Sequence, residues 1–279
     1  MPIYDEWLLG EVDPAYRRRA KIIFDELEKI LGKAKLLDVG CGKGFYENAI
    51  GLVHPEWSVV GVDKNQAYLE TARQKTVAKN VKYVSADTSR LPFGEEEFEA
   101  VICTELLEHL KNDGEVLKEI ARVTKKGGVI LITVPHKNYP LAWDPINRIG
   151  ENFFGWHVPA HIWWLAGIWA DHVRLYSEAE LTRKLEKAGF KIEQLWRGTR
   201  WCVPLAHFWL YGIGKNLVEK GWLPDFDRFN YSPKTGWLAQ GVRGVFNLFD
   251  RLNKVWPEEP GKPYLNIIVK CRKADGGRK

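Results

Sequence analysis

Short apolar runs alternate with longer segments of helical periodicity over residues 35–135. The runs predict strands at 35–39, 57–62, 81–85, 98–103 and 127–135. The segments between and around them predict helices at 15–31, 45–54, 65–79, 113–123 and 177–189. Two further strands are expected at 191–196 and 265–271. This alternation is typical of an α/β fold with a mainly parallel sheet covered on both faces.

The first strand ends on three spaced glycines in the stretch LLDVGCGKG, residues 36–44. Glycine tolerates positive φ and lets another group approach the backbone, so Gly40, Gly42 and Gly44 predict a ligand platform. A purely structural tight turn is the alternative. The spacing G-x-G-x-G lacks the third glycine of the dinucleotide fingerprint, because position 45 is phenylalanine. A nicotinamide cofactor is therefore disfavoured, and the chain has no G-x-x-x-x-G-K-[ST] loop for ATP.

Acidic residues follow the next two strands. Asp63 ends the second strand, where a carboxylate can accept hydrogen bonds from both hydroxyls of a ribose. Asp87 ends the third strand and can accept from an exocyclic amine such as that of adenine. Together with the glycines, these strand ends predict an adenosine site without a pyrophosphate cradle. Loop solvation or helix capping is the alternative role for both acids.

At this point the chain resembles the class I S-adenosylmethionine-dependent methyltransferases. The resemblance rests on LLDVGCGKG (36–44), VVGVD (59–63), SADTSRLPFGEEEFEAVICTELLEHL (85–110), KKGGVILITVP (125–135) and HVRLYSEAELTRKLEKAGFKIEQL (172–195), in the order of the family. It implies a Rossmann-like, doubly wound, seven-stranded sheet whose last strand is antiparallel. It also implies S-adenosylmethionine as cofactor and S-adenosylhomocysteine as product.

The resemblance implies a role for each matching residue of the cofactor site. Gly40, Gly42 and Gly44 would underlie the methionine part, Asp63 would hold the ribose, and Asp87 with Thr88 would face the adenine. The remaining cofactor contacts are expected at the ends of the same strands, from Asp38, Lys64 and Thr104.

The end of the fourth strand bears on the acceptor. It reads CTELLEHL and lacks the NPPY-like tetrapeptide shared by base-methylating enzymes, which argues against a DNA or RNA base. It resembles the E-x-x-E-H stretch of quinone-type and other small-molecule methyltransferases, in which these residues face the acceptor or a metal ion in some members. Glu105, Glu108 and His109 are therefore candidates, with Glu108 and His109 expected to be catalytic, although both glutamates could instead cap or solvate the next helix. His136, just past the fifth strand, is a second candidate base.

Two aromatic insertions interrupt the pattern, at 137–176 and 201–263. Of the 13 tryptophans, all but Trp7 and Trp57 lie after residue 140. We expect one methyltransferase domain over 1–279, with the insertions forming a cap that covers a small, apolar or lipid-like acceptor. Within the second insertion, apolar residues at helical steps predict a stripe of Leu238, Val242, Val245, Phe249, Leu252 and Trp256. The stripe could pack on the sheet as a lid, or it could lie on a membrane surface.

The remaining features bear on charge, metal binding and localisation. The formal net charge is +5, which permits contact with anionic partners without requiring it. The four cysteines form no zinc or redox pair, and the HVPAH segment holds a proline between its histidines, so no metal is expected. No signal peptide or membrane span is evident, which predicts a cytoplasmic protein with peripheral membrane contact as a further option. An RNA methyltransferase and a non-catalytic cofactor-binding scaffold remain alternative functions, and the oligomeric state stays open.

Overall fold

A computed structural model describes residues 4–8, 11, 13–162, 165–214, 217, 220, 222, 237–255 and 258–274. Its centre is a seven-stranded sheet in the order β3-β2-β1-β4-β5-β7-β6, of which only β7 runs antiparallel to its neighbours. This confirms the predicted fold class. The strands are β1 Lys35–Val39, β2 Ser58–Asp63, β3 Val81–Ser85, β4 Phe98–Thr104, β5 Thr124–Pro135, β6 Phe190–Arg197 and β7 Asn266–Lys273.

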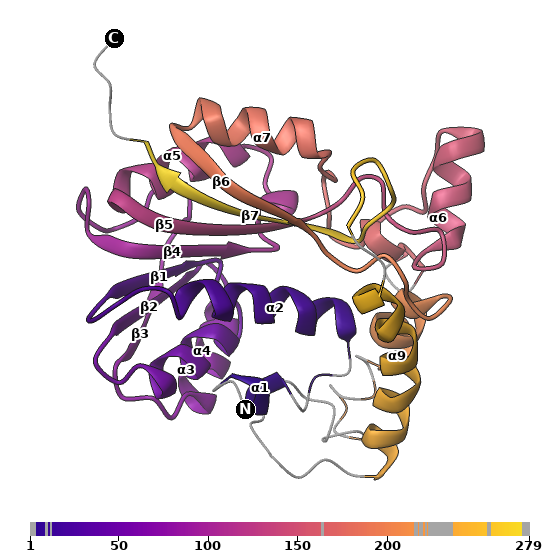
Figure 1. Cartoon of the computed structure of the whole chain (residues 1–279), viewed down its shortest axis with the longest axis horizontal. Helices are drawn as coiled ribbons and strands as arrows, with labels where there is room; N and C mark the ends of the chain where they lie inside the picture. Colours follow the sequence, from indigo (N-terminus) through magenta and orange to yellow (C-terminus); the bar gives the residue numbers. More distant parts are fainter. Residues whose placement is uncertain are drawn as a thin grey trace.

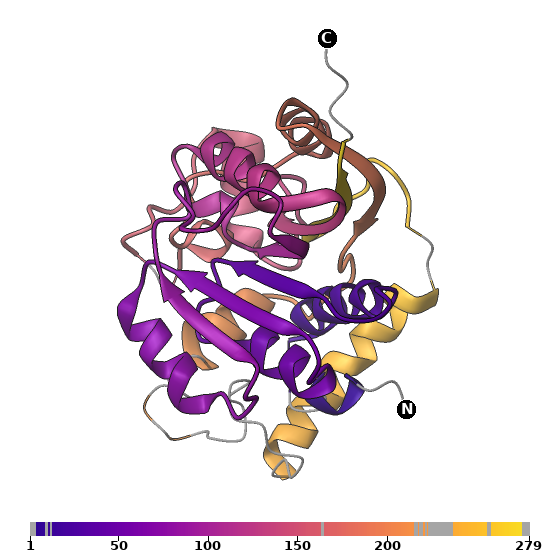
Figure 2. The same cartoon turned by 90° about the vertical axis from the view of Figure 1, so that its left-hand side faces the viewer.

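Helices cover both faces of the sheet (Figures 1 and 2). Alternate residues of β1 face opposite ways, so Leu37 and Val39 enter one core cluster and Leu36 enters the other. The first cluster is closed by α5 and α7, and the second by α2 and α3. The helices are α1 Asp5–Leu8, α2 Pro14–Leu27, α3 Phe45–Val53, α4 Gln66–Lys75, α5 Asp113–Val123 and α7 Glu178–Lys187.

Several element boundaries differ from the sequence prediction. Helix α2 ends at Leu27 instead of residue 31, because the chain turns at 28–32 to enter β1, and Leu31 is 91% exposed. Helix α4 ends at Lys75, where Thr76 adopts an extended conformation. Strand β5 begins at Thr124, ahead of the predicted glycine pair. Helix α5 has the predicted bounds, and Ser177 caps α7 as expected by accepting from the Glu180 amide.

The two insertions, described here as the insertion region, pack together at one end of the sheet (Figure 1). The first follows β5 and consists of short helical elements joined by turns. It holds α6 Pro145–Ile149, a π-helix η2 Gly150–Phe154 and a 3-10 turn η3 Gly167–Trp169. The second contributes a π-helix η4 Phe208–Gly214 and α9 Trp237–Val255. Tyr139 and Trp143 of the first insertion share a third core cluster with Phe246 of the second.

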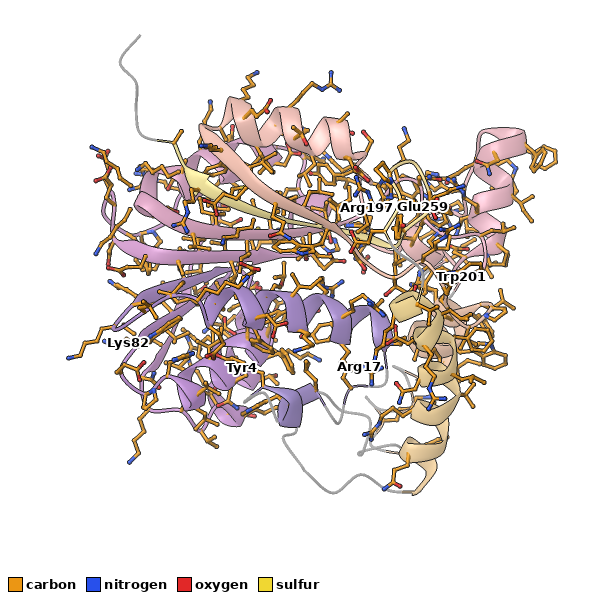
Figure 3. The ribbon with its side chains drawn as sticks, in the orientation of Figure 1. Tyr4, Arg17, Lys82, Arg197, Trp201 and Glu259 are labelled. Atoms are coloured by element: carbon orange, nitrogen blue, oxygen red, sulfur yellow. The ribbon has the colours of Figure 1, made fainter. Side chains whose placement is uncertain are left out.

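Helix α9 lies across the N-terminal end of α2 (Figure 1). Arg17 of α2 points toward α9 in Figure 3, where it donates to Asn247 and lies 3.6 Å from Asp250. Because α2 presents these charges, the inward face of α9 is partly polar, and its buried members are Phe246 and Asp250.

The predicted stripe of α9 is partly covered. Val242 contacts the core cluster, and Phe249 and Leu252 are half-buried, whereas Val245 is 54% exposed. Leu238 and Trp256 have side chains outside the described residues. Among the described helices, none is long and apolar enough to cross a membrane.

Candidate functional site

The glycine turn after β1 has a backbone conformation that residues with a side chain rarely adopt, and it leaves space for a ligand. Gly42 has φ +54° and nothing within 4 Å of the position that a Cβ would occupy. Gly44 has φ +80°, and a Cβ there would come within 2.3 Å of the Tyr83 hydroxyl. A side chain at Gly44 would therefore clash with the fold, whereas Gly42 presents bare backbone to open space. This is the arrangement expected where a ligand lies on the main chain.

Asp63 connects the ends of β1 and β2. Its Oδ2 accepts from the Gly42 amide at 2.9 Å, and its Oδ1 accepts from the Asn65 amide at 2.8 Å. Both bonds fix the carboxylate in one orientation at the open turn. The geometry brings the predicted glycines and the predicted acid into direct contact.

Asp87 and its neighbours lie at the end of β3. Asp87 is exposed, and bonds from the Ser89 amide and hydroxyl lower the pKa of its carboxyl, so it stays ionised at neutral pH. The charge of Lys64, which follows Asp63 and is also exposed, adds to that lowering. Thr88 is 7% exposed. Because β3, β2 and β1 are consecutive in the sheet, these side chains share one edge with the glycine turn.

Asp38 lies within β1 with 1% exposure, near a second buried acid, Glu47 of α3. Burial, together with a smaller contribution from the charge of Asp63, raises the pKa of Asp38 to about 8. Burial, followed by the charge of Asp38, raises the pKa of Glu47 well above its usual range. Two buried acids this close do not both ionise at neutral pH. The sequence pattern did not indicate Glu47 as a site residue, because it resembles any polar residue of an amphipathic helix.

The end of β4 adjoins the glycine turn, since β4 is the other neighbour of β1. A Cβ at Gly40 would lie 2.9 Å from Leu106. Thr104 ends the strand, and Glu105 follows with φ +49°. The Glu105 carboxylate accepts from Thr133 and Asn266 and pairs with Arg19 of α2 at 3.2 Å, so it holds three elements together.

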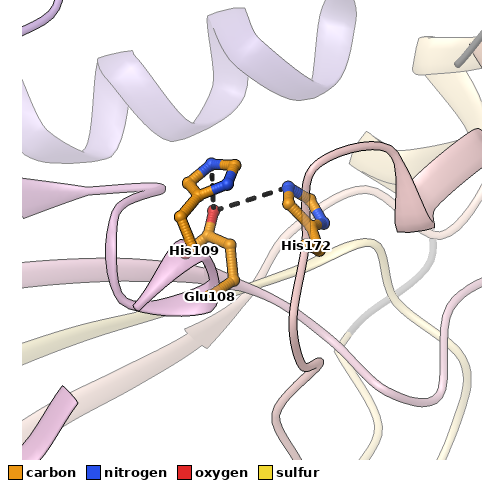
Figure 4. A group of neighbouring side chains, drawn as sticks. All are labelled: Glu108, His109 and His172. Atoms are coloured by element: carbon orange, nitrogen blue, oxygen red, sulfur yellow. Dashed lines mark ion pairs between the residues drawn. The ribbon is translucent and has the colours of Figure 1, made fainter. Parts of the chain in front are cut away.

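Glu108 and His109 lie in the 3-10 turn η1 Leu107–His109, and His172 of the first insertion faces them (Figure 4). One carboxylate oxygen of Glu108, Oε1, is 3.9 Å from Nε2 of His109 and 3.9 Å from Nε2 of His172. Glu108 is fully buried, and neither of its oxygens has a hydrogen-bond partner among the described residues. Burial, followed by the charge of Glu105, raises its pKa well above the usual range.

The two histidines differ in exposure and in their surroundings. The His109 side chain is 38% exposed, and its Nδ1 lies 2.8 Å from the carbonyl oxygen of Asp171. A carbonyl can only accept, so Nδ1 carries the proton and Nε2 of the neutral ring carries a lone pair. Burial, followed by the His109 charge, lowers the pKa of His172 to about 3, which keeps His172 neutral.

His136, the other candidate base, follows β5 and is 5% exposed. Its backbone bridges to Tyr176, and its amide donates to the Leu265 carbonyl at 2.8 Å. Burial lowers the pKa of its ring, which is therefore neutral at physiological pH. No interaction of the described residues joins the His136 and Glu108 side chains.

The structure thus brings the predicted glycines, Asp63 and the β4 end to one edge of the sheet. His172 was not among the sequence candidates, because its relation to Glu108 depends on how the first insertion folds back. The Val173 amide donates to the Glu108 carbonyl at 2.9 Å, and this hydrogen bond holds the first insertion against η1. His172 lies in the loop before the Ser177 cap of α7, and a lone histidine there gave no signal by itself.

Comparison with known proteins agrees with this geometry. The model of the family described as a methyltransferase domain matches residues 37–132. The chain is 30% identical over 146 residues to a malonyl-[acyl-carrier protein] O-methyltransferase of Legionella pneumophila, covering 48% of this chain and 51% of the relative. It is also 30% identical over 166 residues to a demethylmenaquinone methyltransferase of Staphylococcus aureus, covering 56% of this chain and 67% of the relative. The chain thus spans about half the length of the first of these relatives.

A solved structure of a candidate methyltransferase from Bacillus halodurans has the same fold. Its TM-score is 0.55 at 23% identity, and the match covers 92% of this chain and 99% of that one. The chain therefore belongs to the S-adenosylmethionine-dependent methyltransferases, and the cofactor of that family is S-adenosylmethionine.

Proposed function

We propose that the protein transfers a methyl group from S-adenosylmethionine to a small, apolar or lipid-like acceptor. The cofactor lies on the Gly42 backbone, with its ribose on Asp63 and its adenine beside Asp87 and Thr88. Asp38, Gly40, Gly44, Lys64 and Thr104 support or line this site from the same strand ends. The insertion region acts as a cap over the acceptor within a single domain.

The observation that carries this proposal is the apolar surface of the insertion region. In η2, Phe153 is 77% exposed and Phe154 is 70% exposed. Trp156, just after η2, is 50% exposed. In η4, Trp209 is 51% exposed, and α9 adds Val245 and Leu248. Exposed aromatic and aliphatic side chains on this scale are typical of binding surfaces.

The names of the two relatives point the same way. One methylates a malonyl group on an acyl-carrier protein and the other a demethylmenaquinone, as their names state. A quinone brings a long apolar tail to the enzyme, whereas a malonyl thioester is a small acceptor. The insertion region carries exposed tryptophan and phenylalanine as well as exposed Arg251 and Lys254, which would also suit the surface of a membrane that stores such an acceptor.

Catalysis in this proposal depends mainly on alignment. Holding the sulfonium methyl in line with the nucleophile can contribute roughly 7–11 kcal/mol. His109 is the base that the geometry favours over His136, because it is half-exposed and its Nε2 carries the lone pair. A general base would increase the rate of methyl transfer by about 10²–10⁴-fold where the acceptor must lose a proton.

The experiment is a methyl-transfer assay with labelled S-adenosylmethionine and two acceptors, a demethylated quinol from the apolar class and a malonyl thioester as a small polar one. The proposal expects label in the organic extract with at least one of them. Asp63→Ala is the matched inactive variant. Label that enters RNA instead, or cofactor binding without transfer to any pool, would favour the two alternatives, an RNA methyltransferase or a scaffold.

A further inference from the structure

Two buried acids lie directly behind the glycine turn. Asp38 is 1% exposed and Glu47 is 0% exposed. Alternate residues of β1 face opposite ways, so Asp38 faces the same side as Leu36, toward α3, where Glu47 lies in the first turn. The two carboxyl groups are in hydrogen-bonding contact. A carboxylate can only accept, so this contact requires a proton on one of the two groups.

The fold leaves space for the Glu47 carboxyl where β2 has no side chain. A Cβ at Gly61 would lie 2.5 Å from Oε1 of Glu47 and 3.0 Å from the Cβ of Cys41, which belongs to the glycine turn. A glutamate at this helix position often turns back to cap the helix, but Glu47 points into the interior. Any other residue at position 61 would displace the carboxyl from its place beside the turn.

The charged groups that act on this pair are acids. Asp63 acts on Asp38 with its negative charge, and no lysine, arginine or histidine of the described residues forms an ion pair with Asp38 or Glu47. Arg19 of α2 reaches the neighbourhood but is paired with Glu105. The other titratable groups near the pair are neutral because burial raises the pKa of each, namely Cys41, Tyr46, Tyr83 and Cys103. The described protein thus gives the pair no positive partner, whereas the cofactor carries a sulfonium.

We propose that Glu47 is a positioning residue for the cofactor: it donates a hydrogen bond to Asp38, and the Asp38 carboxylate that it holds favours the positively charged S-adenosylmethionine over its neutral product S-adenosylhomocysteine. A buried acid that stays protonated can serve as a donor in this way. Burial raises the pKa of both acids, but the hydrogen bond between them lowers that of Asp38 and raises that of Glu47, which makes Glu47 the donor. The inference rests on the cofactor placement of the proposed function and concerns binding alone.

The preference depends on pH in a defined direction. The pKa of Asp38 is raised to about 8, mainly by burial, so Asp38 ionises as the pH rises through that value. A nearby sulfonium favours the ionised form, so binding of S-adenosylmethionine releases a proton below this pH, and its affinity rises with pH. The neutral product lacks this effect. Each unit by which the cofactor lowers the pKa corresponds to about tenfold in the ratio of the two affinities.

The test is calorimetry of the full chain with S-adenosylmethionine and S-adenosylhomocysteine, from about one unit below to one unit above pH 8. Buffers of different ionisation enthalpy count the protons released. We expect the parent to release protons with S-adenosylmethionine at the lower end of this range. Its preference for S-adenosylmethionine should rise about tenfold across the range. Asp38→Asn should show neither effect.

Two substitutions of Glu47 separate positioning from packing. Glu47→Gln still donates to Asp38, so its preference at the upper end of the range should stay within about twofold of the parent. Glu47→Met fills a similar volume without a donor, so Asp38 stays protonated, and the preference should fall about tenfold and no longer change with pH. Glu186→Met makes the same change at an exposed position of α7, is the matched control, and should behave as the parent.

The melting temperature of each variant accompanies the binding data. The proposal is overturned if Glu47→Met keeps the parent's preference, or if it weakens both ligands equally at an unchanged melting temperature. Where Glu47→Met does not fold, proton release that persists in Asp38→Asn contradicts the proposal. A parent that binds both ligands with a preference independent of pH refutes this inference and leaves the proposed function intact. A parent that binds neither ligand refutes the cofactor site as well.

Discussion

The cofactor edge of the sheet and the insertion region are built on opposite principles. At the cofactor edge, polar side chains are held by short bonds, as Asp63 is by the amides of Gly42 and Asn65, above a core that is sealed from solvent. In the insertion region, large apolar side chains such as Phe153 and Trp209 remain exposed. In the proposed function, the first region holds the cofactor and the second presents an apolar surface to the acceptor. This division suits an enzyme whose cofactor is constant and whose acceptor is apolar.

The largest expected effect lies at the cofactor edge. Asp63→Ala removes two charge-assisted hydrogen bonds to the ribose, each worth roughly 1.5–3 kcal/mol, so affinity for S-adenosylmethionine should fall by roughly 10²–10⁴-fold. Calorimetry with S-adenosylmethionine and S-adenosylhomocysteine measures it. Asp25→Ala, which removes an exposed α2 carboxylate paired with Lys21, is the control and should bind normally. Unchanged affinity in Asp63→Ala would remove the basis for the cofactor site.

The next effect separates the two faces of α9. Phe246 is 6% exposed and Leu248 is 61% exposed. Phe246→Asp buries a charge and should lower the free energy of unfolding by several kcal/mol, whereas Leu248→Asp should change it by about 0.5 kcal/mol or less. Thermal and denaturant unfolding of the two variants decide this. Equal destabilisation would mean that Leu248 is covered by other parts of the protein.

A smaller effect concerns the surface itself. The double variant Val245→Asp, Leu248→Asp places charge on the exposed face of α9 and should reduce co-sedimentation with anionic liposomes or turnover of an apolar acceptor. Its affinity for the cofactor should not change. The control carries the same charge on another exposed helix face, at Lys118→Asp of α5. If the parent does not bind liposomes and the double variant turns over normally, the surface has neither role.

The smallest expected effect is on stability, at Asp113, which connects α5 to the end of the first insertion and to α7. Burial would raise the pKa of Asp113, but hydrogen bonds from Lys184 and Tyr176 and the charge of Arg174 lower it below the usual value. A lowered pKa in the folded state contributes stability above the unfolded-state pKa of about 3.9, and that stability is lost as pH falls through the folded value.

The melting temperature of the parent should therefore fall below about pH 4. In Asp113→Asn the fall should be shallower, and the starting value at neutral pH should be lower. Asp25→Asn serves as the control, because that carboxylate is exposed. A pH profile of Asp113→Asn that overlays the parent would show that Asp113 does not carry this contribution.

The two regions also differed in how far the sequence predicted them. The sheet, its order of elements and the contact between Asp63 and the glycine turn follow from local patterns, because strand ends of a parallel sheet meet at one edge. The buried face of α9 could not be predicted, because it depends on Arg17 and Arg18 of a helix more than 200 residues away. The position of His172 beside Glu108 has the same origin, since the fold of the first insertion sets it.

Methyl transfer into a lipid extract is the decisive assay for the proposed function. The parent and Asp63→Ala are incubated with methyl-labelled S-adenosylmethionine and a mixed lipid extract, and the organic and aqueous phases are counted after RNA is removed from a parallel sample. The account predicts label in the organic phase with the parent and a loss of that label in Asp63→Ala. Label confined to RNA, or to the unreacted cofactor despite measured binding, would contradict it.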